Sequence, residues 1–124
     1  IREARQQEDE RSHNAVQYAT LATADVPLGI ARKAHHVLQL LEQVVEIGNH
    51  NAVIDAAVGA QMALTAVEGA ALTVRANLMG VTNKEIVARY TDDVDYVVEQ
   101  SRAICDRVLK IAAQRTGLDE DTSV

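Results

Sequence analysis

The sequence predicts an all-α protein, an up-down bundle of about four long helices that dimerises through its central helix. Apolar residues recur at three-and-four spacing along most of the chain, and no stretch alternates apolar and polar residues over the length of a strand. Phe and Trp are absent and only 2% of residues are aromatic, so the core consists of small aliphatic side chains, which let helices approach closely. Short polar connections between the apolar stretches are typical of antiparallel neighbours.

The chain is long enough for one domain. With 124 residues it can bury a single core, and no composition shift divides it into two parts. We place one helical bundle domain at residues 1–117. After Gly117 the sequence turns acidic, and we expect residues 118–124 to form a disordered tail.

The first two predicted helices meet at Pro27, the only proline in the chain. Because the residue before a proline is driven out of the helical conformation, we expect a first helix from near the start to about Thr23. The second helix then begins around Pro27, with Asp25 as its N-cap, and Gly48 ends it in a left-handed conformation. Its apolar stripe consists of Leu28, Ala31, Ala34, Val37, Leu38, Leu41, Val44 and Val45.

The third predicted helix, 51–79, is apolar on nearly every side, which is typical of the central helix of a bundle. Asn51 is its expected N-cap. Polar side chains interrupt the apolar sequence before it reaches the length of a bilayer span, so we expect burial in a core and no membrane partner. These interruptions are Asp55, Gln61, Glu68 and Arg75.

A fourth helix is expected after Gly80, where Thr82 and Glu85 have the spacing of a capping box. Its inner side carries apolar residues at helical spacing, with Ser101 and Cys105 among them. The expected inner residues are Ile86, Val87, Tyr90, Val94, Val97, Val98, Ser101, Ile104, Cys105, Val108, Ile111 and Ala112. A cysteine at such a position is more often an apolar filler than a nucleophile.

The charge pattern excludes several classes of function. The chain carries 12 basic and 18 acidic side chains, a net charge of −6, and no cluster of Lys and Arg, so we expect no nucleic-acid partner. The four histidines show no metal-ligand spacing, and we expect no metal. One cysteine and no leader-like segment favour a reducing, cytoplasmic setting.

One arc of the third helix combines polar side chains with glycines. At about 100° per residue, the arc contains Asn51, Asp55, Gly59, Met62, Ala66, Gly69, Ala70, Thr73 and Asn77. Asp55 and Asn77 lie roughly 33 Å apart along the axis, so one chain cannot bring both to one small molecule. Two copies packed antiparallel across a two-fold axis would do so twice. Alternatively, Asn51 caps the helix, the carboxylate of Asp55 is stabilised by the positive end of the helix dipole, and the glycines only permit close packing.

Three segments together resemble a known family. They are 26–28 (VPL), 48–56 (GNHNAVIDA) and 68–78 (EGAALTVRANL). Their order and spacing resemble the patterns VPL, GN-x-N-x-x-S-D and GA-x-x-N-V-x-x-N of the formiminotransferase-cyclodeaminase and methenyltetrahydrofolate cyclohydrolase family. The resemblance implies an all-helical, dimeric protein of one-carbon folate metabolism. Its members either expel ammonia from 5-formiminotetrahydrofolate or hydrolyse the methenyl ring to 10-formyltetrahydrofolate.

The resemblance implies roles for particular residues. Asp55 is the implied catalytic carboxylate, because it can stabilise a methenyl cation and move a proton. The implied substrate-binding residues are Asn49, Asn51, Thr73, Asn77 and Arg75, the last toward an anionic glutamate tail, with Lys84 and Arg89 as weaker candidates. No cofactor is implied beyond the tetrahydrofolate substrate.

The sequence also departs from the family pattern. Ile54 replaces a serine, Thr73 replaces an asparagine, and the glycine-rich amino-terminal segment of the family has no counterpart here. A shortened, non-catalytic helical dimer that binds a ligand or a protein therefore remains the alternative.

Overall fold

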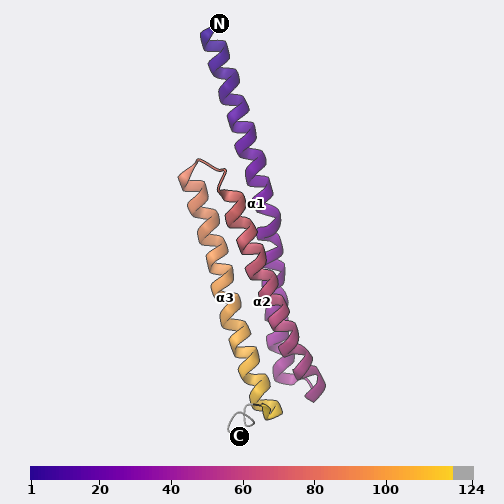
Figure 1. Cartoon of the computed structure of the whole chain (residues 1–124). Helices are drawn as coiled ribbons and strands as arrows, with labels where there is room; N and C mark the ends of the chain where they lie inside the picture. The colour runs from indigo at the N-terminus through magenta and orange to yellow at the C-terminus, as the bar shows by residue number, and fades with distance from the viewer. Residues whose placement is uncertain (119–124) are drawn as a thin grey trace.

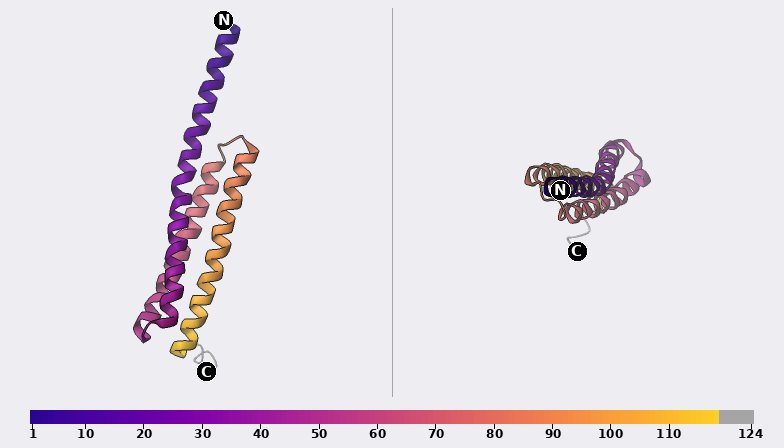
Figure 2. Two further views of the ribbon diagram at one scale, coloured as in Figure 1. Left: turned by 180° about the vertical axis from the view of Figure 1, so that it is seen from behind. Right: turned by 90° about the horizontal axis from the view of Figure 1, so that it is seen from above.

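The computed structural model describes residues 1–118 and contains three helices: α1 (Arg2–Ile47), α2 (His50–Leu78) and α3 (Lys84–Thr116). In Figure 1 they run down, up and down, side by side, and the first part of α1 projects beyond the ends of α2 and α3. Seen from above, the three helices do not lie in one row, and each has an outward side (Figure 2). No strand occurs in this part of the chain. The predicted tail, except Leu118, lies outside the described residues.

The prediction of about four helices is wrong, because the first two are one continuous helix through Pro27. A proline inside a helix has no N–H to donate to the carbonyl four residues earlier, here that of Thr23. The side-chain amide of Asn77 donates to this carbonyl oxygen at 2.8 Å and replaces the missing bond. Asp25 therefore lies inside α1 and caps nothing; its Oδ1 accepts a hydrogen bond from the Tyr90 hydroxyl at 2.5 Å.

The helix starts also differ from the predicted caps. Asn49, not Asn51, caps α2, since its Oδ1 accepts the Ala52 N–H at 2.9 Å. Asn83 caps α3 in place of the predicted capping box at Thr82, because its Oδ1 accepts the N–H groups of the third helix's first turn. In both helices the cap is the residue that directly precedes the first helical residue. The observed helix starts differ from the predicted ones by one or two residues, and this shift changes which side chain is the cap.

Gly48 ends α1 with extended backbone, φ −70° and ψ 159°, and not in the predicted left-handed conformation. Glycine is needed there for space. A Cβ at this position would lie 2.8 Å from the carbonyl oxygen of Val44 and 2.9 Å from the Cβ of Ala52. The close approach lets α2 start two residues after α1 ends, so the two helices form a tight hairpin.

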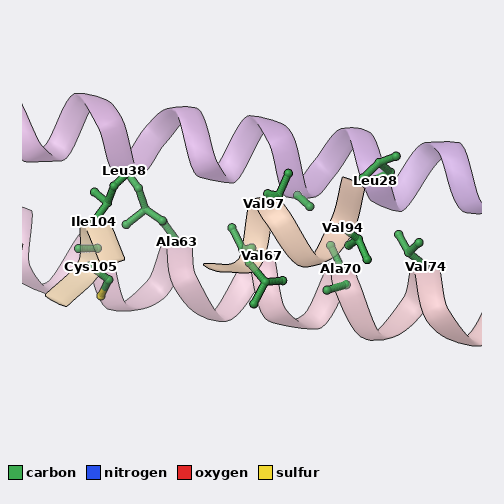
Figure 3. Packing of buried hydrophobic residues seen from close by; sticks show 14 of the residues in the cluster. Leu28, Leu38, Ala63, Val67, Ala70, Val74, Val94, Val97, Ile104 and Cys105 are labelled. Carbon is green, nitrogen blue, oxygen red and sulfur yellow. The ribbon is translucent and has the colours of Figure 1, made fainter. Parts of the chain in front are cut away.

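The core lies between the three helices and consists of aliphatic side chains, mostly Ala and Val. Figure 3 shows Leu38 of α1, Val67 of α2 and Val94 and Ile104 of α3 directed into this shared space. The predicted inner side of α3 is confirmed from Val94 to Ala112. The buried members of that side are Val94, Val97, Val98, Ser101, Ile104, Cys105, Val108 and Ala112.

The predicted stripe of the second helix separates into two in the structure. Leu28, Ala31, Leu38 and Val45 are buried, whereas Val37 and Val44 are exposed. The core-facing residues and the outward-facing residues lie on two different sides of α1, and the single predicted stripe combined these two sides.

Helix α2 packs against both other helices, as α1 and α3 also do, so the predicted central burial holds for one side of the helix only. It is also long and apolar enough to cross a membrane by length and composition, the one such helix between residues 1 and 118. One third of its most apolar window is buried against the rest of the protein. Its other side is exposed and carries three of the predicted site residues, Asn51, Asp55 and Thr73.

Candidate functional site

The outward face of α2 carries three of the predicted site residues. Asn51, Asp55 and Thr73 are all exposed and lie on the side of the helix turned away from the core. The core face is defined by buried residues such as Val53, Val67 and Val74. Within residues 1–118, no aliphatic side chain covers this face, so a ligand or another protein can reach it.

Asp55 is the only carboxylate on this face between Asn51 and Met79. Within residues 1–118 its oxygens take part in no hydrogen bond and no ion pair, whereas Glu42 and Glu68 each bind an arginine of α3. Its place in the second turn of α2 leaves it near the positive end of the helix dipole. An accessible carboxylate with all its acceptor positions free can bind a cation or accept a proton.

The two asparagines before Asp55 have different tasks. The side-chain oxygen of Asn49 accepts the N-cap hydrogen bond from the Ala52 N–H, which leaves the side-chain N–H groups of Asn49 as donors. Asn51 lies in the first turn and is exposed, so both its amide groups face solvent on the same side as Asp55. Asn51 is therefore the freer of the two for binding a ligand.

Thr73 and Arg75 lie on different sides of α2. The hydroxyl of Thr73 donates to the Gly69 carbonyl oxygen at 3.1 Å, a bond within the helix that leaves the hydroxyl oxygen open to solvent. Arg75 points toward α3, where its guanidinium donates to the carboxylate of Asp95 at 2.7 Å. The structure thus separates Arg75 from the face that carries Asp55.

Asn77 is half-buried at the far end of the same face. Its amide nitrogen is bound to the Thr23 carbonyl oxygen, as described above. Next to it is an open hollow of about 440 Å³ between α1 and α2, lined by Val16, Ala19, Thr20, Thr23, Ala76, Asn77 and Gly80. One N–H of the Asn77 side chain thus holds α2 against α1, while the oxygen and the second N–H of the same side chain are not used in that bond.

Asp55 and Asn77 therefore do not form one site within one chain. They are 22 residues apart on a single straight helix, roughly 33 Å along its axis. Two glycines lie between them. Gly59 has Leu41 of α1 as a neighbour, 3.3 Å from where a Cβ would stand, but no atom of the described residues 1–118 lies within 4 Å of a Cβ at Gly69. Close packing among residues 1–118 therefore explains a glycine at position 59 but not the glycine at position 69.

Other reactive side chains are part of the core or its border. Burial raises the pKa of the Cys105 thiol, which keeps it protonated and inert. Ser101 is fully buried and shares a 2.8 Å hydrogen bond with Nδ1 of His35, which links α3 to α1. Within residues 1–118, no three His, Cys, Asp or Glu side chains gather as ligands of one metal ion would.

Comparison with known proteins decides the family. The model of the family described as formiminotransferase-cyclodeaminase matches residues 1–96, more than half of the chain. The chain belongs to the formiminotransferase-cyclodeaminase family. The matched segment includes all of α1 and α2 and every residue that the sequence resemblance assigned to a site.

A curated relative agrees with this family. The methenyltetrahydrofolate cyclohydrolase of Methylorubrum extorquens is 29% identical over 93 residues, which is 75% of this chain and 45% of that protein. The chain thus spans about half the length of the curated relative it matches. The family resemblance of the sequence is confirmed, and the roles of single residues stay predictions.

The structure separates one surface of α1 that the single predicted stripe of the second helix did not distinguish. The outward side of α1 carries exposed aliphatic residues next to the α2 face, including Val37, Leu40 and Val44. The signal was present in the sequence as a regular three-and-four repeat. The repeat runs across Pro27, where the sequence predicts a boundary between two helices, so its two halves belong to different predicted helices.

Proposed function

We propose that this protein is an enzyme of one-carbon folate metabolism, a methenyltetrahydrofolate cyclohydrolase or a formiminotetrahydrofolate cyclodeaminase. The observation that carries the proposal is the free, exposed carboxylate of Asp55 on the outward face of α2, inside the segment that the family model matches. The name of the Methylorubrum extorquens relative supports the cyclohydrolase. The substrate is a tetrahydrofolate derivative, and the reaction needs no further cofactor.

Asp55 suits the chemistry of either reaction. The methenyl bridge carries a delocalised positive charge, which a nearby carboxylate stabilises. In hydrolysis, water adds to the methenyl carbon and loses a proton to the carboxylate. The hydroxyl of this adduct then loses its proton and becomes the formyl C=O as the bond from the carbon to one ring nitrogen breaks; that nitrogen takes up a proton, and the formyl group stays on the other nitrogen. In the cyclodeaminase reaction the same carboxylate stabilises the same cation as ammonia leaves.

The neighbouring polar groups suit the pterin and its tail. Asn51 and the free amide groups of Asn49 offer donors close to Asp55, and Thr73 and Asn77 offer donors and acceptors at the other end of the face. A pterin ring presents both donors and acceptors, which carboxamides match. Arg75 is held by Asp95, so it would meet a glutamate tail only at the edge of the site.

A homodimer completes the site. If α2 of one copy packs antiparallel against α2 of another, Asp55 of each copy approaches Asn77 of the other, which gives two equivalent sites. The acidic balance of the chain disfavours nucleic acid as a partner, and the face has polar groups that disfavour a membrane. The unpaired thiol of Cys105 is compatible with the cytoplasm, where we place the protein.

The test is the loss of methenyltetrahydrofolate absorbance with purified protein, run beside an assay for ammonia release from the formimino substrate. We expect turnover in one of the two, and a fall of at least about 100-fold for Asp55→Asn, the size typical for a lost general base. Asp106→Asn on the exposed side of α3 is the matched control and keeps full activity. Absence of both reactions, or an Asp55→Asn variant as active as the control, would contradict the proposal.

A further inference from the structure

Pro27 leaves a hydrogen-bond acceptor in α1 that Asn77 of α2 uses. Because Pro27 has no N–H, the carbonyl oxygen of Thr23 lacks the bond that a regular helix would give it. The side-chain nitrogen of Asn77 donates to this oxygen at 2.8 Å. A proline ring also crowds the carbonyl four residues earlier, which favours an orientation directed out of the helix. The proline thus makes the Thr23 carbonyl available to the neighbouring helix.

This bond fixes the orientation of the Asn77 carboxamide. A carbonyl oxygen can only accept, so the group that faces Thr23 is the NH₂ group and not the side-chain oxygen. Because a carboxamide is planar, one fixed N–H also fixes the directions of the oxygen and of the second N–H. Turning the group over would set two acceptors against each other at a half-buried position, which is unfavourable. The side chain of Asn77 is therefore held in one orientation.

The hollow beside Asn77 gives this orientation a consequence. Seven residues line the hollow of about 440 Å³ between α1 and α2, and only Thr20, Thr23 and Asn77 among them have polar side chains. Both threonine hydroxyls donate to carbonyl oxygens inside α1, at 2.8 Å and 2.6 Å. The second N–H of Asn77 is therefore the one side-chain donor of this lining that has no acceptor among residues 1–118.

A fixed carboxamide suits the recognition of a pterin. Under the proposed function Asn77 binds the substrate, whose ring presents donors and acceptors in a set order along its edge. A carboxamide that is already oriented presents its own donor and acceptor in a set order as well. It also loses little conformational entropy when the ligand binds, which strengthens binding.

We infer that Pro27 is a positioning residue for the folate substrate, because it frees the Thr23 carbonyl to hold the Asn77 carboxamide in the orientation that meets the ligand. The inference rests on the proposed function, since it assigns a bound substrate to Asn77. It also gives a reason for a proline in the interior of a 46-residue helix, where proline otherwise destabilises.

Pro27→Ala tests the inference because it should separate stability from substrate binding. The new N–H at position 27 bonds to the Thr23 carbonyl, so α1 becomes regular and should melt at an equal or higher temperature. The Asn77 amide then competes for this carbonyl and is no longer fixed. We expect KM for the folate substrate to rise about tenfold, the effect of one lost hydrogen bond in ground-state binding, and kcat to change by less than about twofold.

Gly29→Ala is the matched control. Gly29 lies in the same turn of α1, and a Cβ there would have no atom of residues 1–118 within 4 Å. Alanine again favours the helix, but the bond between Thr23 and Asn77 stays in place. KM should therefore remain at the wild-type value. An equal rise in KM for Gly29→Ala and Pro27→Ala would overturn the inference, because a stiffer helix alone would then account for it.

A double-mutant cycle in KM tests whether Pro27 acts through Asn77. Asn77→Ala should raise KM at least as much as Pro27→Ala, because it removes the contact itself. The double variant should have the KM of Asn77→Ala alone, since no amide remains to be positioned. Effects on KM that multiply would show that the two residues act separately and would overturn the inference.

Nuclear magnetic resonance of the whole isotope-labelled chain tests the orientation without substrate. One side-chain proton of Asn77 should exchange slowly with water in the wild type and in Gly29→Ala, because it is bonded to Thr23. In Pro27→Ala this slow exchange should be lost, and unchanged exchange would overturn the inference. Loss of the slow exchange in Pro27→Ala, combined with a wild type that turns over no folate, would contradict the proposed function and still support the hold of Pro27 on Asn77.

Discussion

The side-chain amide of Asn77 donates a hydrogen bond of 2.8 Å to the carbonyl oxygen of Thr23, four residues before Pro27. This is the carbonyl that a residue with an N–H at position 27 would satisfy. A bond from α2 thus repairs the gap that proline makes in α1 and ties the two helices together. The family pattern contains both the proline and this asparagine, and the structure gives them a common purpose.

Asn77→Ala should destabilise the protein. The Thr23 carbonyl loses its partner at a half-buried place, and we expect the free energy of unfolding to fall by about 1–2 kcal/mol. Urea denaturation followed by circular dichroism measures the change. Asn51→Ala, an exposed asparagine without a cap bond, is the matched control and should change stability by less than about 0.5 kcal/mol.

The same bond predicts a coupling between Asn77 and Pro27. In a Pro27→Ala background the new N–H bonds to the Thr23 carbonyl, so Asn77→Ala should cost clearly less than it does in the wild-type chain. A double-mutant cycle isolates this difference, which we expect at about 1 kcal/mol. Additive effects of the two substitutions would show that the side-chain bond does not compensate for the proline.

Tyr90 should make stability depend on pH in the alkaline range. Its hydrogen bond to the Asp25 carboxylate, followed by burial, raises the pKa of the phenol above its ordinary 10.0. A group whose folded pKa is raised adds stability that is fully present below the unfolded pKa and is lost as pH rises through the folded pKa. Stability should therefore decline above about pH 10, and Tyr90→Phe should remove this part of the decline.

Titration of the phenolate absorbance checks the same point directly. The absorbance should show a late step that belongs to Tyr90, because the pKa of this phenol is raised. In Tyr90→Phe the late step should disappear. If the late step persists in that variant, the raised pKa belongs to another tyrosine.

Leu38 and Leu40 test the two sides of α1. Leu38 is fully buried and Leu40 is 48% exposed, although they are two residues apart on one helix. Leu38→Ala should lower the free energy of unfolding by about 3 kcal/mol, because it leaves a cavity among α1, α2 and α3. At concentrations where the chain is monomeric, Leu40→Ala should cost less than about 1 kcal/mol. Equal costs would contradict the division of α1 into an inner and an outer side.

Gly69→Ala should raise the stability of the monomer and weaken its association into a dimer. No atom of residues 1–118 lies within 4 Å of the added methyl group, and alanine favours a helix over glycine by about 1 kcal/mol, so the monomer should unfold at a higher temperature. If Gly69 meets a second backbone, the dimer should dissociate more easily. Ala66→Gly on the same face, followed by thermal melting, should lower the melting temperature of the monomer.

Much of the local structure was predictable because it depends on neighbours along the chain. The helical content and the buried side of α3 follow from spacing, and the family follows from three short motifs. The helix caps were harder. Asn49 and Asn83 compete with Asn51 and Thr82 for the same role, and the geometry of the turn selects between them.

The continuity of α1 could not be read from its residues, since a proline normally ends or bends a helix and the compensating amide comes from Asn77, 54 residues away. The same holds for the site. The motifs mark Asp55 and Asn77, but only the packed structure shows that Asp55 is exposed and has no partner among residues 1–118, while Asn77 is already bound to α1. Short-range periodicity is written into the order of the amino acids; which groups find a partner depends on contacts that exist only once distant segments lie side by side.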